Sequence, residues 1–396
     1  MDRDLEQTVT LAGARVALSG SESMRQDIII SGGHIRFSAP NLSQRILDMR
    51  GFLVLPGLIN AHDHLEFNLF PRLGHGHYEN ATAWAEDIYR PESAPLRQHL
   101  QVPKPARLLW GGIKNLLAGV TSVSHHNPYE PSVFEDRFPV RVVKRFGWAH
   151  SLRFCSDVRE RFEQTPQGAP FIIHAGEGSD VQARGEVYSL DEVKVLGPST
   201  VIVHGVAIER EDICLLKTRG ASVVWCPSSN YFTLGRTLSS EVIRAGIPVA
   251  LGNDSALTAD GDFLDELAVA RRHAGLCEIY EMATEKAARI LHLNSGEGRI
   301  QDGGVADLVI VRDEGQTPAE ALLVLRPELV LLSGEIKLLS ASMAARLNFR
   351  GITRFEAIEV EGRGRSYIDC PVTSLKQQTA KYLSKKLLLA GKRVSV

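Results

Sequence analysis

Short apolar runs separated by Gly- and Ser-containing turns make up the first part of the chain. The runs TVTLAGARVAL, QDIIISGGHIRFS and RILDMRGFLVLP have the length and spacing of β-strands. From about residue 56 the pattern changes, and strand-like runs alternate with helix-period stretches such as PARLLWGGIKNLLAG. These runs are GLINAH, VTSVSHH, VRVVKRFGWAH, FIIHAGE, TVIVHG, ASVVWCP and IPVALGNDS. Strand–helix alternation over roughly 240 residues predicts a parallel α/β architecture.

Turn-punctuated strands return near residue 299, in GRIQDGGVADLVIVRD and PELVLLSGEIKLLS. We therefore expect the strand-rich segments at the two ends of the chain to pair. The predicted fold class is α/β, a (β/α)8 TIM-like barrel with a small β-sandwich domain built from both chain ends. The predicted limits are 1–55 and 299–396 for the two parts of the β domain and 56–298 for the barrel.

Two segments stand outside this pattern. The stretch 68–106 is rich in Pro, Gly and His, and a long excursion after the first strand of a barrel usually covers the active site. It holds a second His-x-His pair, His75 and His77, but no strand aims this pair, so a structural or substrate-side role is favoured over metal ligation. The tail TSLKQQTAKYLSKKLLLAGKRVSV has helical spacing, and a solvated helix packed on the body is favoured over a membrane-surface helix.

The composition is that of a globular protein, with 44% hydrophobic and 23% charged residues. A formal net charge of -2 gives no reason to expect nucleic acid or an anionic membrane as a partner. The five cysteines are scattered and never form C-x-x-C, which favours reduced thiols in a cytoplasmic protein. The polar N-terminus is unlike a signal peptide, and no apolar stretch is long enough to span a bilayer. The expected partner is a small-molecule substrate, and a homodimer is left open.

Side chains that commonly bind metals stand where the apolar runs end. The run GLINA is followed by His62 and His64, which would point to the same face of a strand because side chains alternate. His174, His204 and Asp254 each end a later run. In a parallel barrel the carboxyl ends of the strands converge on one face, where the active site lies. One such histidine is more often a packed core residue, but four strands ending in this way predict a metal site.

The motifs PGLINAHDH, HAGE, VHG, CPSSN and LGNDS, in this order, resemble those of the amidohydrolase superfamily, within its cytosine deaminase and chlorohydrolase-like branch. GRIQDGGVADLVIV resembles the family's return into the β domain, so the similarity covers nearly the whole chain. The resemblance implies a distorted (β/α)8 barrel with one divalent metal. It assigns the metal-ligand positions to His62, His64, His174 and Asp254. It also implies that Glu177 is the proton-shuttling glutamate and that His204 orients water or substrate.

The chemistry of these side chains agrees with the resemblance. Three imidazoles and a carboxylate leave a coordination position open for water, whose pKa a divalent metal can bring down to about 7. Asp254 can take the proton of that water as it attacks. Glu177 can receive the proton and deliver it to the leaving nitrogen, unless it is simply an exposed loop carboxylate. His204 can polarise the developing oxyanion.

Lys144 bears on the number of metals. Some dinuclear relatives in this family use a carboxylated lysine at the end of the fourth strand. Lys144 is the only lysine of VRVVKRFGWAH, and this run continues well past it. Together with HAGE on the fifth strand, this favours one metal over two. His150, at the end of the same run, is either a residue near the metal or substrate or a packed core histidine.

Departures from the family pattern concern the substrate. Asn253 stands where the family more often has Thr, and the pair His125–His126 at the end of VTSVSHH is not widely shared. Strand alternation lets one histidine of this pair face the pocket, and we choose His126. Polar residues beside the active-face strand ends suit a small heterocycle or amide. The expected substrate-binding residues are Glu66, His126, Ser229 and Asn230, with Asn68 on the same loops.

These features predict a metal-dependent hydrolase that acts on a non-peptide C–N bond, most simply by deaminating an amino-substituted nitrogen heterocycle. Opening of a cyclic amide or imide, and removal of another leaving group, are enzymatic alternatives because the same metal-hydroxide machinery serves all three. The non-enzymatic alternative is an inactive scaffold on this fold, which should have lost some of its ligands. Zinc is the expected metal, and iron or manganese stays open because imidazole and carboxylate accept all three.

Overall fold

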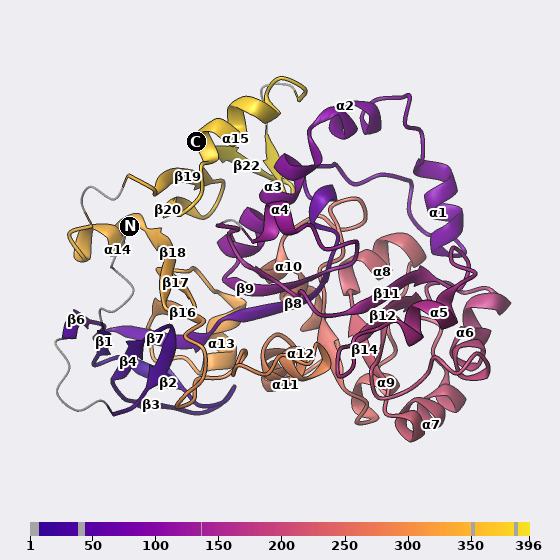
Figure 1. Ribbon diagram of the computed structural model, residues 1–396, viewed down its shortest axis with the longest axis horizontal. Coiled ribbons are helices and arrows are strands. Elements are labelled where there is room, and N and C mark those ends of the chain that lie inside the picture. Colours follow the sequence, from indigo (N-terminus) through magenta and orange to yellow (C-terminus); the bar gives the residue numbers. More distant parts are fainter. Residues whose placement is uncertain (1–7, 39–43, 136, 350–352, 384–386) are drawn as a thin grey trace.

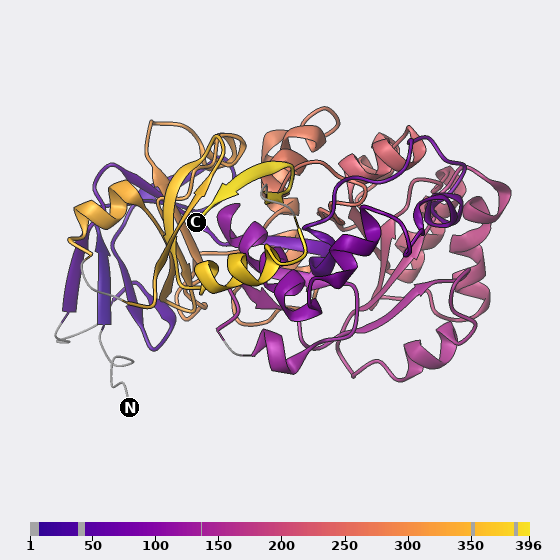
Figure 2. The same cartoon turned by 90° about the horizontal axis from the view of Figure 1, so that it is seen from above.

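The protein is described here by a computed structural model that covers residues 8–38, 44–135, 137–349, 353–383 and 387–396. It consists of two parts that lie side by side (Figures 1 and 2). The middle of the chain forms an α/β part, and the two ends of the chain together form a β-rich part. In this described portion, no helix combines the length and the apolar character needed to cross a membrane.

Eight strands form the wall of the α/β part. They are β8 (Leu58–Asp63), β9 (Val120–His125), β10 (Arg141–Val142), β11 (Gly147–Ser151), β12 (Phe171–Ala175), β13 (Thr200–His204), β14 (Ser222–Trp225) and β15 (Val249–Leu251). They pair in parallel as β10-β9-β8 and β11-β12-β13-β14-β15. A parallel bridge between Asp63 and Asp254 joins the two groups. The arrangement is TIM-barrel-like, but in the described residues no ladder joins β10 to β11.

Burial on both faces explains why these strands are continuous hydrophobic runs. Every residue of β12 (FIIHA) and β13 (TVIVH) is buried. The run VRVVKRFGWAH is different, because we expected one strand and the structure divides it into β10 and β11. Lys144 and Arg145 lie between the two strands and are exposed, since a buried wall cannot hold two neighbouring cations. Lys144 forms an ion pair with Glu135 at the surface.

Helices connect and surround these strands. In chain order they are α3 (Lys104–Leu117), α4 (Pro131–Phe134), α5 (Val158–Glu163), α6 (Val181–Glu192), α7 (Arg210–Arg219), α8 (Pro227–Leu234), α9 (Ser240–Arg244), α10 (Phe263–Ala270), α11 (Leu276–Met282) and α12 (Glu285–Ile290). The excursion 68–106 contains α1 (Ala81–Ile88) and α2 (Leu96–Gln101). α1 lies at the end of the α/β part that is remote from the β-rich part (Figure 1).

The β-rich part holds two sheets. The first has the order β5-β4-β1-β6, and the second β21-β22-β19-β20-β18-β17-β16-β7-β2-β3. The N-terminal strands are β1 (Thr8–Ala12), β2 (Arg15–Ala17), β3 (Ser23–Arg25), β4 (Ile28–Ser31), β5 (His34–Arg36), β6 (Gln44–Asp48) and β7 (Phe52–Pro56). The C-terminal strands are β16 (Leu308–Arg312), β17 (Leu329–Leu332), β18 (Glu335–Ser340), β19 (Glu356–Val360), β20 (Gly364–Ile368), β21 (Leu388–Leu389) and β22 (Lys392–Ser395). The chain ends meet where β7 pairs antiparallel with β16.

A buried hydrophobic cluster contains residues of both sheets, among them Leu11, Ile30, Phe52 and Leu308. The helices of the C-terminal segment are α13 (Pro318–Leu323), α14 (Ala341–Arg346) and α15 (Val372–Thr379). The helix that we expected for the whole tail is shorter. It ends at Thr379, and the tail closes with the antiparallel pair β21–β22, which joins β19. Gly391, at the turn between these strands, has a φ of +73°, a conformation that glycine adopts without strain.

Candidate active site

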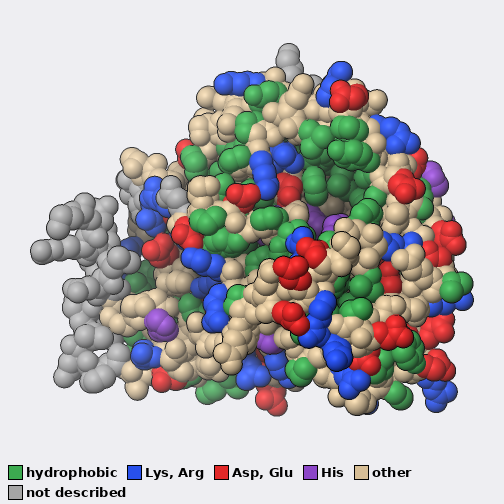
Figure 3. Space-filling model, turned by 45° about the vertical axis from the view of Figure 1, so that its right-hand side comes forward, with side chains coloured by type: hydrophobic (Ala, Val, Ile, Leu, Met, Phe, Trp, Pro, Cys, Tyr) green, Lys and Arg blue, Asp and Glu red, His purple; other side chains and the backbone are tan. Residues whose placement is uncertain are grey.

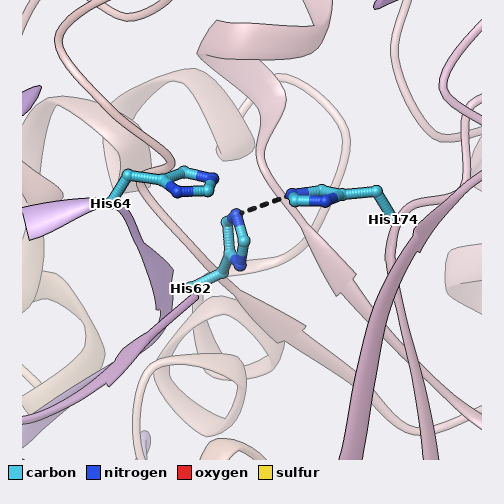
Figure 4. A group of neighbouring side chains, drawn as sticks. All are labelled: His62, His64 and His174. Carbon is cyan, nitrogen blue, oxygen red and sulfur yellow. Dashed lines mark hydrogen bonds between the residues drawn. The ribbon is translucent and has the colours of Figure 1, made fainter. Parts of the chain in front are cut away.

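Three histidines point their ring nitrogens toward one another at the carboxyl ends of β8 and β12 (Figure 4). They are His62 in β8, His64 directly after it, and His174 in β12. Nε2 of His62 lies 3.3 Å from Nε2 of His174. Asp254 follows β15, and its Oδ1 lies 3.6 Å from Nε2 of His62 and 3.5 Å from Nε2 of His64. His204, at the end of β13, also brings a ring nitrogen within 4.8 Å of donor atoms of His62 and Asp254.

These distances fit a divalent metal. Bonds of about 2.0–2.1 Å in a tetrahedral shell place neighbouring donor atoms about 3.3–3.4 Å apart. The protonation of His174 is also suitable, because its Nδ1 donates to the carbonyl of His150 at 2.8 Å and so leaves Nε2 with a free lone pair. Burial lowers the pKa of His62 to about 3, and that of His174 well below its usual range, so both rings are neutral donors at pH 7.

Asp254 is held as a carboxylate. Its Oδ2 accepts hydrogen bonds from Ser229 Oγ at 2.6 Å and from Thr258 Oγ1 at 2.9 Å, which turns Oδ1 toward the histidines. Burial alone would raise the pKa of Asp254, but the hydrogen bond with His62 and the nearby His64 and His204 keep it well below its usual range. Asp254 has a φ of +56°, a left-handed conformation that costs free energy in a residue other than glycine.

Glu177 lies in the loop after β12, with Oε1 3.5 Å from Nε2 of His204. Burial, opposed by His204 and assisted by the charge of Asp254, raises the pKa of Glu177 to about 7. This carboxyl group can therefore take up and release a proton near neutral pH. His204 has a φ of +75°, and its Nδ1 donates to Oδ1 of Asn230 at 2.8 Å. Because Nδ1 holds this proton, His204 can donate from Nε2 only when it carries both protons.

A cavity of about 350 Å³ opens onto this cluster. Its inner end is formed by polar side chains of the cluster, and its outer part is mostly apolar. The lining residues are His64, Phe67, Ala81, Trp84, Ala85, Ile88, Tyr89, His150, Phe154, His174, Glu177, His204, Asp254, Ser255 and Leu257. Figure 3 shows a hollow with histidine side chains at its base and hydrophobic side chains on its upper rim. The excursion 68–106 supplies α1 to this wall.

The four expected substrate-binding residues are not among the residues that line the cavity. Ser229 and Asn230 instead bond to Asp254 and His204, so they contact the reactive side chains rather than the cavity. Glu66 accepts a hydrogen bond from Asn127 Nδ2 at 2.7 Å, and its Oε2 lies 3.6 Å from Nε2 of His125. Glu66 Oε2 is buried without a hydrogen-bond partner in the described part of the chain, so a contact of Glu66 with the substrate stays a prediction.

His126 is not among the lining residues either, and its Nδ1 is buried without a hydrogen-bond partner in the described residues. It is the histidine of its pair that lies closer to the cluster, with its ring centre 4.2 Å from that of His174. Its Nε2 lies 3.2 Å from the carbonyl of Ala149. His150, whose role the sequence left open, lines the cavity instead. His75 and His77 do not belong to the donor groups found among the described residues.

The sequence analysis did not identify a buried polar network behind β8. Lys114 of α3 has its Nζ 3.0 Å from Oδ2 of Asp63, 2.7 Å from Oδ1 of Asn68 and 2.5 Å from Oδ1 of Asn253. Asp63 also accepts from Asn60, Asn68 and Asn115. Asp63 stands between His62 and His64, and Asn253 directly precedes Asp254. Lys114 therefore ties together the two strand ends that carry these donors. The sequence feature that could have indicated this network is the polar pair Lys114–Asn115 inside the otherwise apolar helical stretch PARLLWGGIKNLLAG.

Lys114→Met should lower the free energy of unfolding by about 3–5 kcal/mol, because it leaves the carboxylate of Asp63 buried without its cation. Urea denaturation of the metal-free protein measures this loss. Lys104→Met is the matched control on the same helix, since the ion pair of Lys104 with Glu130 is about one-third exposed and should be worth less than about 1 kcal/mol. Equal losses in the two variants would contradict the stabilising role of Lys114.

The chain is similar to a known protein family and to named relatives. Residues 166–337 match the model of the amidohydrolase family. The 5-methylthioadenosine/S-adenosylhomocysteine deaminase of Syntrophobacter fumaroxidans is 27% identical, with 72% of this chain and 78% of the relative covered. The enzyme of the same name from Pyrococcus furiosus is 25% identical, with 73% and 82% covered.

Solved structures show the same fold. A zinc-bound adenosine deaminase from Xanthomonas campestris has a TM-score of 0.72 at 18% identity, covering 95% of this chain and 97% of that one. An atrazine chlorohydrolase from Arthrobacter aurescens TC1, complexed with zinc, has a TM-score of 0.69 at 17% identity, covering 94% and 99%. The fold and the donor cluster thus define a metal-dependent hydrolase. The family match over residues 166–337 and the deaminase relatives agree with the amidohydrolase resemblance of the motifs.

Proposed function

We propose that this protein deaminates an amino-substituted nitrogen heterocycle by hydrolysis. The observation that carries the proposal is Glu177, whose pKa of about 7 lets it exchange protons beside the donor cluster at the inner end of the cavity. The relatives named as deaminases support the same reaction. His62, His64, His174 and Asp254 would hold one divalent metal, which we propose is zinc. That metal supplies Lewis acidity, which makes water a usable nucleophile near neutral pH.

In this proposal Asp254 and Glu177 transfer protons, and His204 stabilises charge. Water adds to the ring carbon that bears the amino group, and Asp254 is placed to accept its proton. Glu177 receives this proton and delivers it to the amino nitrogen, so that the C–N bond breaks and ammonia leaves. The second proton of the water ends on the neighbouring ring nitrogen as the ring carbonyl forms. A doubly protonated His204 would stabilise the negative charge that develops on the attacking oxygen. Asn230 keeps the His204 ring in the orientation that faces Glu177.

We propose one metal rather than two. The side chain of Lys144 is 65% exposed and paired with Glu135, so it is not available as a carboxylated ligand. We also propose that residues 1–55 and 299–396 form a single β-sandwich domain beside a barrel of residues 56–298. The buried cluster shared by the two terminal sheets supports this division.

The chlorohydrolase among the structural neighbours keeps a second reaction open, the hydrolytic removal of another leaving group from a ring. An assay for released ammonia over amino-purines, pyrimidines, pterins and triazines, with zinc-loaded protein, tests the first choice. We expect ammonia from at least one ring system. Release of chloride or methanol from substituted triazines, with no ammonia from any ring, would favour the alternative. No product from any substrate would support the inactive scaffold.

A further inference from the structure

α1 has an apolar face that the rest of the protein covers only in part: Trp84 packs against the buried cluster of Phe70, Leu96 and Leu257, and the face stays half-buried. Ala81, Trp84, Ala85 and Ile88 follow the i, i+3, i+4, i+7 spacing of one helix face. No residue of α1 is buried, and all four of these side chains line the cavity. An amphipathic helix normally packs its apolar face on a core, because exposed apolar surface is unfavourable. This face instead looks into the space that leads to Glu177 and the donor cluster.

The helix is tied to the loop of Glu177. The backbone N–H of Ala81 donates to the carbonyl of Glu177 at 3.1 Å, and Asn80 forms an antiparallel bridge with Gly178. The Asn80 side chain caps α1 by accepting from the N–H of Ala83 at 2.9 Å. Trp84 Nε1 donates to the carbonyl of Leu73 at 3.0 Å, which satisfies its polar edge and leaves its ring as apolar surface. The apolar face is therefore positioned together with the proton-transferring residue.

The outer cavity offers no lysine or arginine as a partner for an anionic ligand group. Beyond α1 it is lined by Phe67, Phe154 and Leu257, and no lysine or arginine is among the lining residues. The nearby Arg153 already pairs with Asp180 at 2.7 Å and with Glu186 at 3.4 Å. The two carboxyl groups of the lining, Glu177 and Asp254, lie at the inner end with the donor cluster. An anionic substituent placed against α1 would lose its hydration without gaining a counterion, which is strongly unfavourable.

We propose that α1 selects the substrate by its substituent: the heterocycle reaches the donor cluster, and an uncharged, apolar group on it covers Ala81, Trp84, Ala85 and Ile88. This inference rests on the proposed function and deepens it. A cavity of about 350 Å³ is at the small end of ligand sites, which holds one ring system with a short substituent. Substrates that carry a carboxylate, phosphate or zwitterionic group at this end are excluded.

Matched probes test the selection. They are 9-butyladenine and 4-(adenin-9-yl)butanoate, followed by the same butyl and carboxypropyl pair on any other ring that releases ammonia. We expect kcat/KM, or the inhibition constant for a probe that is not turned over, to favour the butyl compound by at least about 100-fold, since burying an unpaired carboxylate is costly. Comparable values for the two probes would overturn the selection while leaving deamination intact. Absence of ammonia from every ring would instead contradict the proposed function.

Two substitutions on α1 distinguish a change in the apolar face from a general effect of added positive charge on the helix. Ile88→Lys places a cation in the cavity, and Glu86→Lys places one on the exposed side of the same helix. Ile88→Lys should reduce the preference for the butyl probe at least tenfold, and Glu86→Lys should leave it near the wild-type value. Equal effects of the two variants would overturn the assignment to α1. The wild-type comparison of the two probes decides the proposal even if Ile88→Lys does not fold.

Discussion

Protein purified as His174→Ala should lose its metal while keeping its fold. His174 supplies Nε2 to the donor cluster at 3.3 Å from Nε2 of His62, and its removal leaves three of the four proposed donors. An incomplete shell binds a structural or catalytic ion far more weakly. Elemental analysis should therefore find about one divalent metal per wild-type chain and a small fraction of that in the variant.

His150→Ala is the matched control for this experiment. Its imidazole also lines the cavity, but it is absent from the donor groups found in the described chain. The control should therefore keep its metal. Full metal occupancy in His174→Ala would contradict the proposed ligand set. Two metals per wild-type chain would contradict the mononuclear proposal.

Glu177→Gln should keep the metal and the fold but lose about 10²–10⁴-fold in turnover, the range that general acid–base residues contribute. The amide has nearly the same shape as the carboxyl group but cannot take up and release a proton. Glu177 also lies in the cavity wall beside His204, whereas its side chain is not part of the donor cluster. Steady-state rates of ammonia release, measured together with metal content, separate loss of proton transfer from loss of the ion.

Glu192→Gln, in the last turn of α6, is the control for removing a glutamate charge at a residue that does not line the cavity. Its turnover should equal that of the wild type. Near-normal turnover of Glu177→Gln would remove this residue from the mechanism. A parallel loss of metal and activity would instead assign it to metal binding.

The alternation of side chains along a strand could not predict the orientation of Glu66 and His126. Both residues are close to active-face strand ends, so a position near the pocket was a sound expectation. Their direction depends on η2 (Leu65–Phe67), which turns Glu66 toward Asn127 and His125, and on the loop after β9. Alternation in a strand does not continue through a 3-10 turn or past the strand end. The sequence pattern therefore located these residues near the site but could not decide whether their side chains line the cavity.

The backbone of His204 and Asp254 is a second case. Both adopt positive φ, which a non-glycine residue holds only when its surroundings stabilise it. The backbone N–H groups of Asn253 and Asp254 both donate to the carbonyl of His62, at 2.9 and 3.0 Å, and so constrain the backbone at Asp254. The motif LGNDS contains the residues, but the conformation that directs Asp254 toward the histidines arises from contacts between β15 and β8.

The order of apolar runs and the polar residues at their ends predicted, without any structure, an α/β fold and a metal site among His62, His64, His174, His204 and Asp254. The family resemblance then implied which four of these are the ligands. The first of these predictions was possible because period-two alternation and burial on both faces act locally on each strand. Only the tertiary structure decided which side chains from distant segments contact one another around that cluster. Lys114, Asp63 and Asn253 come from three distant segments, and the apolar face of α1 becomes a wall only when the excursion returns to the loop of Glu177. Such contacts depend on the packing of the whole chain, which local periodicity does not encode.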